Sequence, residues 1–413
     1  MEQVAVAPRP TLRAASEEGH EHALARRLLA WTGIGLGVVF GLLFLIVGPG
    51  KEGHDSHYLF AQAFLEGRLY IEGSYPWLEL VPRAEGGWYT PFPPLLSVAF
   101  VPFAALDIAV DTNHVAALMG GVSVAVVWLM LGRLGVGLRV RLGLTLAWAV
   151  GSQLLWLAGE GGQHLAPQVT AAALLLAVLT LGLERRWPFL AGLLLAAAVC
   201  ARLPVVFALP LVLWLYRPER QATPFLERHP WSLVLAAMII PGLLVALYNM
   251  ARFGSLIEFG YGMIEGIDGQ HVLDEPWYHD GIISLAYLPN GLYTMLLRGF
   301  EVRDAFPWVY GSIAGTSILL TMPILWWVSE ARGRLAVAAA VSAALVMVPN
   351  LLHGNPGFAQ IGYRFILDAL PMLWLMLGIA FHRSMPRAAA VALGAGIVAN
   401  VWLASVYWSG LVE

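Results

Sequence analysis

The run "LLAWTGIGLGVVFGLLFLIV" (28–47) decides the fold class, because it contains no charged residue. A helix of about 20 apolar residues crosses the roughly 30 Å hydrocarbon core of a bilayer. The whole chain of 413 residues agrees, since 59% of it is hydrophobic and only 12% is charged. An ordinary soluble domain has about twice that charged share, near 25%. The sequence therefore predicts an all-α, polytopic membrane helical bundle.

With the further apolar runs, the sequence predicts about eleven transmembrane helices. The predicted spans are 28–47, 114–132, 142–158, 165–183, 189–201, 204–216, 231–249, 308–328, 335–352, 366–381 and 388–409. The first follows Arg26 and Arg27 and has no A-x-A site after it, so we expect a retained helix and not a cleaved signal peptide.

The arginines predict the topology. The segment "GRLGVGLRVR" (132–141) falls on the cytoplasmic side only if the apolar stretch 93–110 lies along the membrane interface and does not cross it. Under this topology the N-terminus is cytoplasmic, most arginines lie inside, and most acids and histidines lie outside. We expect a multi-pass protein of the inner or plasma membrane with its site on the outer face.

This topology divides the chain into four parts. They are a cytoplasmic tail (1–27), a transmembrane module (28–249) with an outer loop (49–113) that holds juxtamembrane helices, a second outer loop with an interfacial helix (250–307), and C-terminal transmembrane helices (308–413). The net charge of −3 argues against a nucleic-acid partner, and the single cysteine, Cys200, cannot form an internal disulfide.

The first outer loop opens with "KEGHDSHYLFAQAFLEGRLY" (51–70), which places His54, Asp55 and His57 directly after a span. The apolar spacing that follows predicts a short amphipathic helix with Asp55 at or beside its N-cap. One interpretation is that Asp55 only caps this helix and that the histidines are solvated surface residues.

Other charged residues are also predicted to lie near the outer surface of the membrane. Glu160 and His164 lie in the next outer loop, "GEGGQHLAP" (159–167), and a carboxylate there is costly if it faces lipid. Arg202 in "CARLPVV" and Arg364 in "GYRFILDALP" lie at outer helix ends. Each arginine could be a snorkelling anchor, but together with the acids they indicate a shared site for an anionic headgroup.

These segments resemble the GT-C superfamily, integral membrane glycosyltransferases that take a sugar from a polyprenyl-linked donor. The family pattern has an early Asp in the first outer loop, matched by "GHDSHYLFAQAFLEGRLY" (53–70), and an aromatic-proline opening of the second juxtamembrane helix, matched by "WYTPFPPLLSVAFVPFAAL" (88–106). The segments "CARLP", "YNMARFGSLIEFGY" (248–261) and "GYRFILDALP" are similar to its later motifs. The resemblance covers almost the whole chain and includes the protein O-mannosyltransferase and aminoarabinose transferase type, but it identifies no subfamily.

The resemblance implies a polyprenyl-phosphate sugar donor, inverting transfer, and roles for particular residues. Asp55 and Glu160 are expected to be catalytic, with Asp55 as the base. The donor phosphate is expected to bind Arg202, Arg364 and Arg298, and His54, His57, Tyr89, His164 and Tyr363 are expected to orient the substrates. The acceptor, whether a lipid, glycan or protein, is left open.

A metal cofactor is also left open. A divalent ion such as Mg²⁺ or Mn²⁺ would bind through Asp55, Glu160, His57 and His164, since carboxylates and imidazoles suit such ions.

The rival classes are a transporter or lipid flippase and a noncatalytic scaffold. No internal repeat is visible, and the ionisable residues gather at one face and not along a path through the spans, which argues against a transporter.

Overall fold

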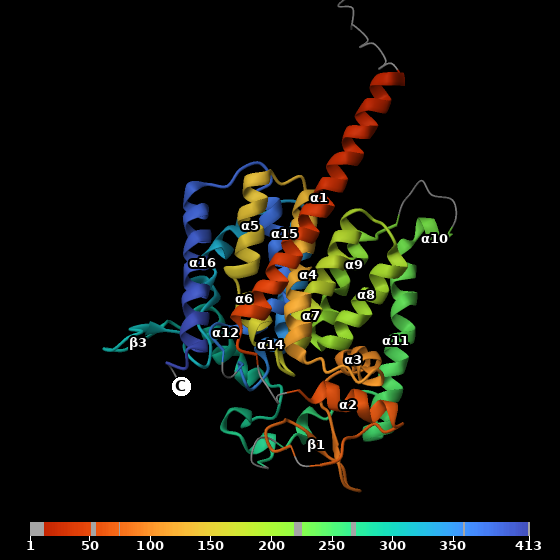
Figure 1. Ribbon diagram of the computed structural model, residues 1–413, viewed down its shortest axis with the longest axis vertical. Coiled ribbons are helices and arrows are strands. Elements are labelled where there is room, and N and C mark those ends of the chain that lie inside the picture. The colour runs from red at the N-terminus through yellow and green to blue at the C-terminus, as the bar shows by residue number, and fades with distance from the viewer. Residues whose placement is uncertain are drawn as a thin grey trace, which may run out of the picture.

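The computed structural model describes residues 12–50, 55–73, 75–218, 225–265, 270–357 and 360–411, and they form a bundle of long helices that run along a common direction (Figure 1). The α-helices are α1 (Leu12–Val47), α2 (Ser56–Leu65), α3 (Leu95–Ala105), α4 (Thr112–Arg133), α5 (Leu138–Val150), α6 (Leu154–Glu160), α7 (Leu165–Leu183), α8 (Pro188–Ala201), α9 (Leu209–Leu215), α10 (Phe225–Arg228), α11 (Pro230–Phe253), α12 (Leu288–Leu296), α13 (Ile318–Thr321), α14 (Arg334–Leu351), α15 (Leu370–Ala380) and α16 (Arg387–Trp408).

Shorter elements connect these helices. The 3-10 helices are η1 (Leu203–Ala208), η2 (Tyr261–Met263), η4 (Val272–Asp274), η5 (Pro276–Tyr278), η6 (Leu285–Tyr287), η7 (Pro323–Glu330) and η8 (Arg364–Asp368). Two antiparallel ribbons complete the described chain: β1 (Val81–Pro82) pairs with β2 (Trp88–Tyr89), and β3 (Glu301–Val302) pairs with β4 (Val309–Tyr310).

The membrane bundle is confirmed, but the expected number of spans is not. In the described part of the chain, six helices are long and apolar enough to cross a membrane: α1 from Arg27, α4, α7, α11, α14 and α16. A seventh is obtained if α5 and α6, which meet at a 46° bend, count as one span. The predicted spans 189–201, 204–216 and 366–381 correspond to the shorter apolar helices α8, η1 with α9, and α15.

The predicted continuous span 308–328 is wrong. This stretch contains β4, an irregular link, α13 and η7, with Pro323 at the start of η7. A proline lacks the backbone N–H that a helix interior needs, so the apolar composition of this stretch does not make it one helix.

Glycines bring α1 and α4 into close contact. A Cβ atom on Gly37 would lie 2.9 Å from the carbonyl oxygen of Gly121, and a Cβ atom on Gly121 would lie 2.3 Å from that of Gly37. Only residues without a side chain allow two helix backbones to approach this closely, as in other membrane helix pairs. The window of α1 that crosses the membrane is only 17% buried, so α4 is its principal support.

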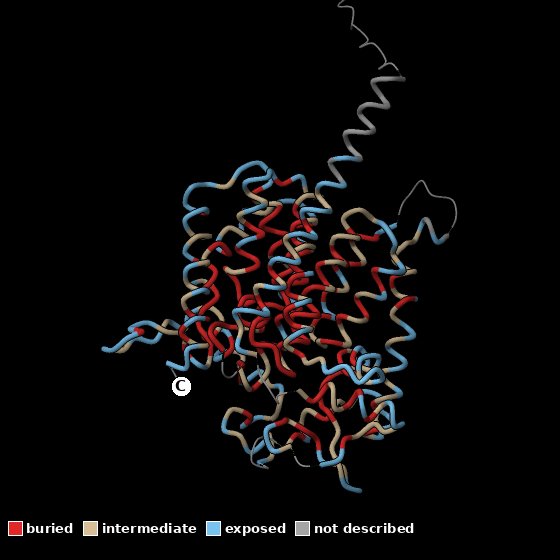
Figure 2. Tube along the Cα trace, viewed as in Figure 1, coloured by how far each residue is buried: buried red, intermediate tan, exposed pale blue. Residues whose placement is uncertain are grey.

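The core lies in the middle of the bundle, and the outer helices expose apolar side chains (Figure 2). Trp148 of α5 and Trp374 of α15 are fully buried and pack edge to face, with ring centroids 5.3 Å apart. Each indole N–H is satisfied, that of Trp148 by the Ser123 hydroxyl and that of Trp374 by the Leu144 carbonyl. Large exposed apolar faces on α1 and α11 are what a lipid-facing surface requires.

One end of the bundle carries most of the loops, and we call it the loop end. In Figure 1 it is the lower end, where α2, α3 and β1 gather, whereas α1 begins at the opposite end. The stretch predicted to lie along the interface forms α3, which packs against α2. A small second core fixes the first loop to α2 and consists of Phe60, Ala63, Ile71, Leu78 and Leu80.

Candidate active site

Asp55 caps two helices at once. It is the N-cap of α2, as the sequence predicted, and its Oδ1 accepts the backbone N–H of His57 at 2.8 Å. Its Oδ2 accepts the backbone N–H of Thr112, the first residue of α4, also at 2.8 Å. Burial raises the pKa of Asp55 above its ordinary value, and the nearby His57 opposes this in part.

His57 lies inside the protein and not at a surface. Its side chain is fully buried, its Nε2 donates to the carbonyl oxygen of Gln163 at 3.3 Å, and its Nδ1 contacts the hydroxyl of Ser97 at 3.0 Å. Burial lowers the pKa of His57, and the nearby Asp55 opposes this in part. These contacts join α2, α3 and the loop before α7, and the role of His57 in orienting a substrate stays a prediction.

Glu160 ends α6 and is only 4% exposed. Its Oε2 accepts the indole N–H of Trp408, from α16, at 2.9 Å. Gly161 follows with φ +65° and ψ −149°, a conformation that only glycine adopts readily. This turn directs the chain back towards α7 and holds the carboxylate against α16.

Thr112 joins the two predicted catalytic loops. Its backbone N–H donates to Asp55, and its hydroxyl oxygen accepts the N–H of Gly162 at 3.1 Å. Asp55 and Glu160 therefore lie at the same end of the bundle, in loops that meet through one residue.

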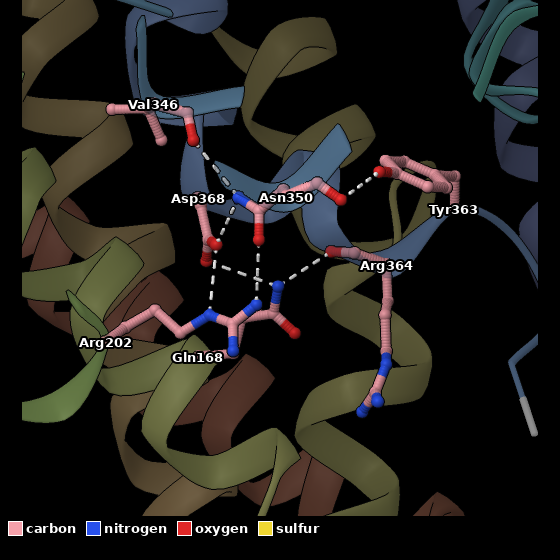
Figure 3. Close-up of polar contacts among 7 residues, drawn as sticks. All are labelled: Gln168, Arg202, Val346, Asn350, Tyr363, Arg364 and Asp368. Carbon is pink, nitrogen blue, oxygen red and sulfur yellow. Dashed lines mark hydrogen bonds and ion pairs between the residues drawn. The ribbon is translucent and has the colours of Figure 1, made fainter. Parts of the chain in front are cut away.

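Arg202 belongs to a buried polar network (Figure 3). Its Nε donates to Asp368 Oδ2 at 3.0 Å and its Nη2 to Asn350 Oδ1 at 3.1 Å. Asn350 and Gln168 also donate to the Asp368 carboxylate, at 2.9 and 3.2 Å. The Asp368 side chain is completely buried, so this ion pair neutralises much of the Arg202 charge.

Arg364 differs from Arg202 in having no such partner. Its backbone takes part in the network through Gln168, but its guanidinium extends away from Asp368 (Figure 3). No ion pair within 4.0 Å joins it to an acid of the described residues, and its buried Nε has no hydrogen-bond partner. The charges of Arg202 and Glu79 both act on it, so the two arginines share one neighbourhood.

Glu79 and His164 connect Arg364 to the first loop. Glu79 Oε2 lies 3.5 Å from His164 Nε2, and the His164 ring packs edge to face on Phe92 at 4.9 Å. Burial raises the pKa of Glu79, and the Arg364 charge partly opposes this. The Glu79 side chain is nevertheless 42% exposed, so it reaches solvent.

The remaining predicted residues are less central. Tyr363 is fully buried, with its hydroxyl 3.3 Å from the Asn350 carbonyl oxygen, and Tyr89 packs on Phe253 at 5.5 Å. Arg298 stacks over Tyr293, and no hydrogen bond between described residues links its side chain to Arg202 or Arg364. His54 lies outside the described residues.

The four predicted metal ligands are not gathered into one group. Within the described ranges, no three His, Cys, Asp or Glu side chains are arranged to hold a metal ion. Both ring nitrogens of His57 contact protein atoms, and Glu160 faces Trp408. This donor set does not fit a divalent ion, and no step of the reaction is assigned to one.

Sequence reasoning left several residues of the site without a role. The sequence could have indicated a role for Asp368, because an acid within an apolar stretch needs a partner. Asn350, Gln168 and Glu79 gave no such indication, because amides and loop acids are common. Arg252, within the segment "YNMARFGSLIEFGY", is 6% exposed, donates to the Thr90 carbonyl, and thereby ties α11 to the first loop.

Comparisons with known proteins place this fold. No protein-family model and no curated protein matches the chain. The solved structure of ArnT from Cupriavidus metallidurans bound to undecaprenyl phosphate matches with a TM-score of 0.50 and 14% identity over 87% of this chain and 61% of that chain. Its apo structure matches with a TM-score of 0.47 and 16% identity over 89% and 62%, and an oligosaccharyltransferase from Archaeoglobus fulgidus with 0.44 and 13% over 92% and 56%.

The first of these matches shows the class of fold. ArnT is an aminoarabinose transferase of the GT-C superfamily, so the chain has the helical membrane fold that its sequence resemblance predicted. The chain spans less than two thirds of the length of ArnT.

Proposed function

We propose that this protein is a membrane glycosyltransferase that transfers a sugar from a polyprenyl-phosphate donor to an acceptor hydroxyl, with inversion at the sugar. The observation that carries the proposal is the guanidinium of Arg364, which lies at the loop end beside Glu79 and has no acidic partner within ion-pair distance among the described residues. A partly buried cation without a fixed counter-ion is suited to an anionic ligand. The likeness to ArnT, solved with undecaprenyl phosphate, supports a polyprenyl lipid as the carrier of that anion.

Arg364 is assigned to the donor phosphate. When the bond between the sugar and phosphate breaks, negative charge grows on the leaving oxygen, and a guanidinium can donate two parallel hydrogen bonds to it. Arg202 is bound to Asp368 through its Nε, so its part is to hold η8 in place and to add positive potential near Arg364. Glu160 is assigned to orienting a hydroxyl of the donor.

A cavity close to Arg364 suits the first part of a lipid chain. It measures about 210 Å³, and its lining includes Leu403, Val406 and Tyr407 of α16. Gln360 also lines it and accepts the backbone N–H of Arg364 through its Oε1 at 3.0 Å. A phosphate at Arg364 would therefore leave its polyprenyl tail beside the apolar surface of α16.

Asp55 is assigned as the base. Its carboxylate takes the proton of the acceptor hydroxyl while the acceptor oxygen forms a bond to C1 of the sugar. The bond from C1 to the phosphate oxygen breaks at the same time, and its electron pair leaves with the phosphate. Attack from the side opposite the leaving group inverts the configuration at C1.

The test is donor turnover by the purified protein in lipid nanodiscs, with a panel of polyprenyl-phosphate sugars. We expect Arg364→Gln to lower kcat by about 10²-fold, the usual effect of removing one donor to a developing oxyanion. Arg332→Gln is the matched control, because Arg332 is an exposed arginine in the turn before α14. Unchanged turnover in Arg364→Gln would remove the phosphate role. Solute movement across sealed vesicles, with no chemical change in any donor, would indicate a transporter.

We also propose that the loop end faces the outside of the cell membrane and the N-terminus the cytoplasm, as the arginine distribution predicts. Single cysteines at Trp77 and Leu138, both exposed, in a Cys200→Ala background test this. A membrane-impermeant maleimide should label position 77 in intact cells and position 138 only after permeabilisation. The reverse pattern would invert the orientation.

A further inference from the structure

A cavity at the loop end opens beside Asp55. It measures about 360 Å³ and is open to solvent. Its lining residues are Asp55, Tyr58, Leu59, Tyr75, Trp77, Ala109, Val110 and Asp111. Its walls are thus the start of α2, the chain after α2, and the residues that lead into α4.

Two carboxylates occupy this lining and no basic residue does. Asp111 is the N-cap of α4, and its Oδ1 accepts the backbone N–H groups of Asn113 and His114 at 3.0 and 3.1 Å. The same oxygen lies 2.6 Å from Nδ1 of the His114 ring, which is outside the lining. The Asp55 carboxylate accepts the backbone N–H of Thr112, the residue that follows Asp111. Both carboxylates therefore lie at the start of α4. A lining with two negative charges disfavours an anionic ligand and provides acceptors for hydroxyl groups.

Aromatic residues also line the cavity. Tyr75 and Trp77 pack edge to face with centroids 6.0 Å apart, and the Trp77 side chain remains 44% exposed. Tyr58 is fixed at its far end, where its hydroxyl donates to the Ile108 carbonyl at 3.0 Å. The lining area is mainly apolar although it contains two acids, the combination typical of a site that orients a ligand by a few polar groups.

We infer that this cavity is the acceptor subsite and that it receives a neutral sugar ring. The apolar C–H face of a pyranose would lie on Trp77, and its hydroxyls would donate to Asp111 and Asp55. The inference rests on the proposed function: the hydroxyl held by Asp55 gives its proton to that carboxylate, its oxygen bonds to C1 of the donor sugar, and the phosphate leaves with the electron pair. It adds that the acceptor is a carbohydrate and that its reacting end carries no negative charge.

Ligand-observed saturation-transfer NMR tests this without any donor chemistry. The probes are methyl β-D-glucopyranoside, methyl α-D-mannopyranoside and, as the anionic match, methyl β-D-glucopyranosiduronate, each added to the full chain in nanodiscs. We expect signal from at least one neutral glycoside and several-fold less from the glucuronide. Trp77→Ala should weaken binding about tenfold, equal to roughly 1.4 kcal/mol, and Trp77→Phe should restore most of it. Asp111→Asn should lessen the preference for the neutral probe.

Matched variants control for general damage. Trp308→Ala removes an exposed tryptophan of the β3–β4 ribbon, and Asp107→Asn removes an exposed acid close to Asp111 but outside the lining. Both should bind as the unmodified protein does. The inference is overturned if no neutral glycoside binds, if Trp77→Ala and Trp308→Ala bind alike, or if the glucuronide binds as well as the neutral probes. Since donor turnover is measured separately, loss of glycoside binding with turnover intact overturns the subsite and leaves the proposed function standing.

Discussion

Replacing Asp55 by Asn separates its two roles, because the carboxylate both caps helices and is assigned to take a proton. Its oxygens accept the backbone N–H groups of His57 and Thr112, both at 2.8 Å, and the backbone of Tyr58 also donates to it. The amide of Asn keeps one oxygen and turns an NH₂ group towards the other N–H. Leaving one buried N–H without an acceptor costs about 1–3 kcal/mol.

A second effect opposes this cost. Burial raises the pKa of Asp55 above 3.8, which means that the folded protein holds the ionised carboxylate less favourably than water does. The stability that protonated Asp55 contributes is therefore present below pH 3.8. It is lost as the pH rises through the higher pKa that Asp55 has in the folded protein. A neutral Asn avoids that loss, so we expect a net destabilisation below about 2 kcal/mol at neutral pH.

Catalysis should fall much further than stability. Removing a general base costs about 10²–10⁴-fold in rate, and we expect that loss in donor turnover by Asp55→Asn, with a small change in the thermal midpoint in nanodiscs. For the unmodified protein, donor turnover should fall at acidic pH, and the midpoint of this fall in the pH–rate profile should lie above pH 3.8. Asp55→Ser, which preserves an N-cap for α2 but no base, should be as inactive as Asp55→Asn. Full donor turnover in either variant would refute the assignment of Asp55 as the base. If the lost turnover returned on cooling, the role of Asp55 would be helix capping alone.

Three further outcomes are expected. Asp368→Asn leaves Arg202, which is 23% exposed, without its counter-ion and should destabilise the protein by about 3 kcal/mol, measured by thermal unfolding, whereas the exposed Asp304→Asn should not. Gly161→Ala should prevent assembly of the α6–α7 turn, because its Cβ would lie 2.0 Å from Asn113 Oδ1 at a positive φ, and protease resistance of the purified protein would report it. Chelation of divalent ions should leave donor turnover unchanged, and a return of lost activity on adding Mn²⁺ would contradict the donor set described above.

The helices that the sequence predicted well are those in which apolar composition and helical continuity coincide. The predicted spans 114–132, 165–183 and 231–249 correspond to α4, α7 and α11 within a few residues. The prediction for 308–328 failed because hydropathy measures composition and not continuity, and Gly311, Gly315 and Pro323 interrupt this stretch. The bend within 142–158 has the same origin, since α5 stops at Val150 and the chain turns through Gly151 before α6.

Side-chain partners were less accessible than helices. The N-cap role of Asp55 could be predicted, because capping depends on residues that are close in sequence. The Arg202–Asp368 ion pair joins positions far apart, and nothing in one sequence indicates which acid an arginine will meet. For the same reason His57 could be expected near the site, but not its contacts with Ser97 and Gln163.

The glycine contact between α1 and α4 has a consequence for biosynthesis. The helix made first leaves the ribosome before its partner exists, and it must wait in the bilayer until the chain has been translated beyond Arg133. A bulkier residue at Gly121 would therefore prevent α1 from packing on α4 during membrane insertion. Cells would degrade the unassembled chain although the residues of its candidate site were unchanged.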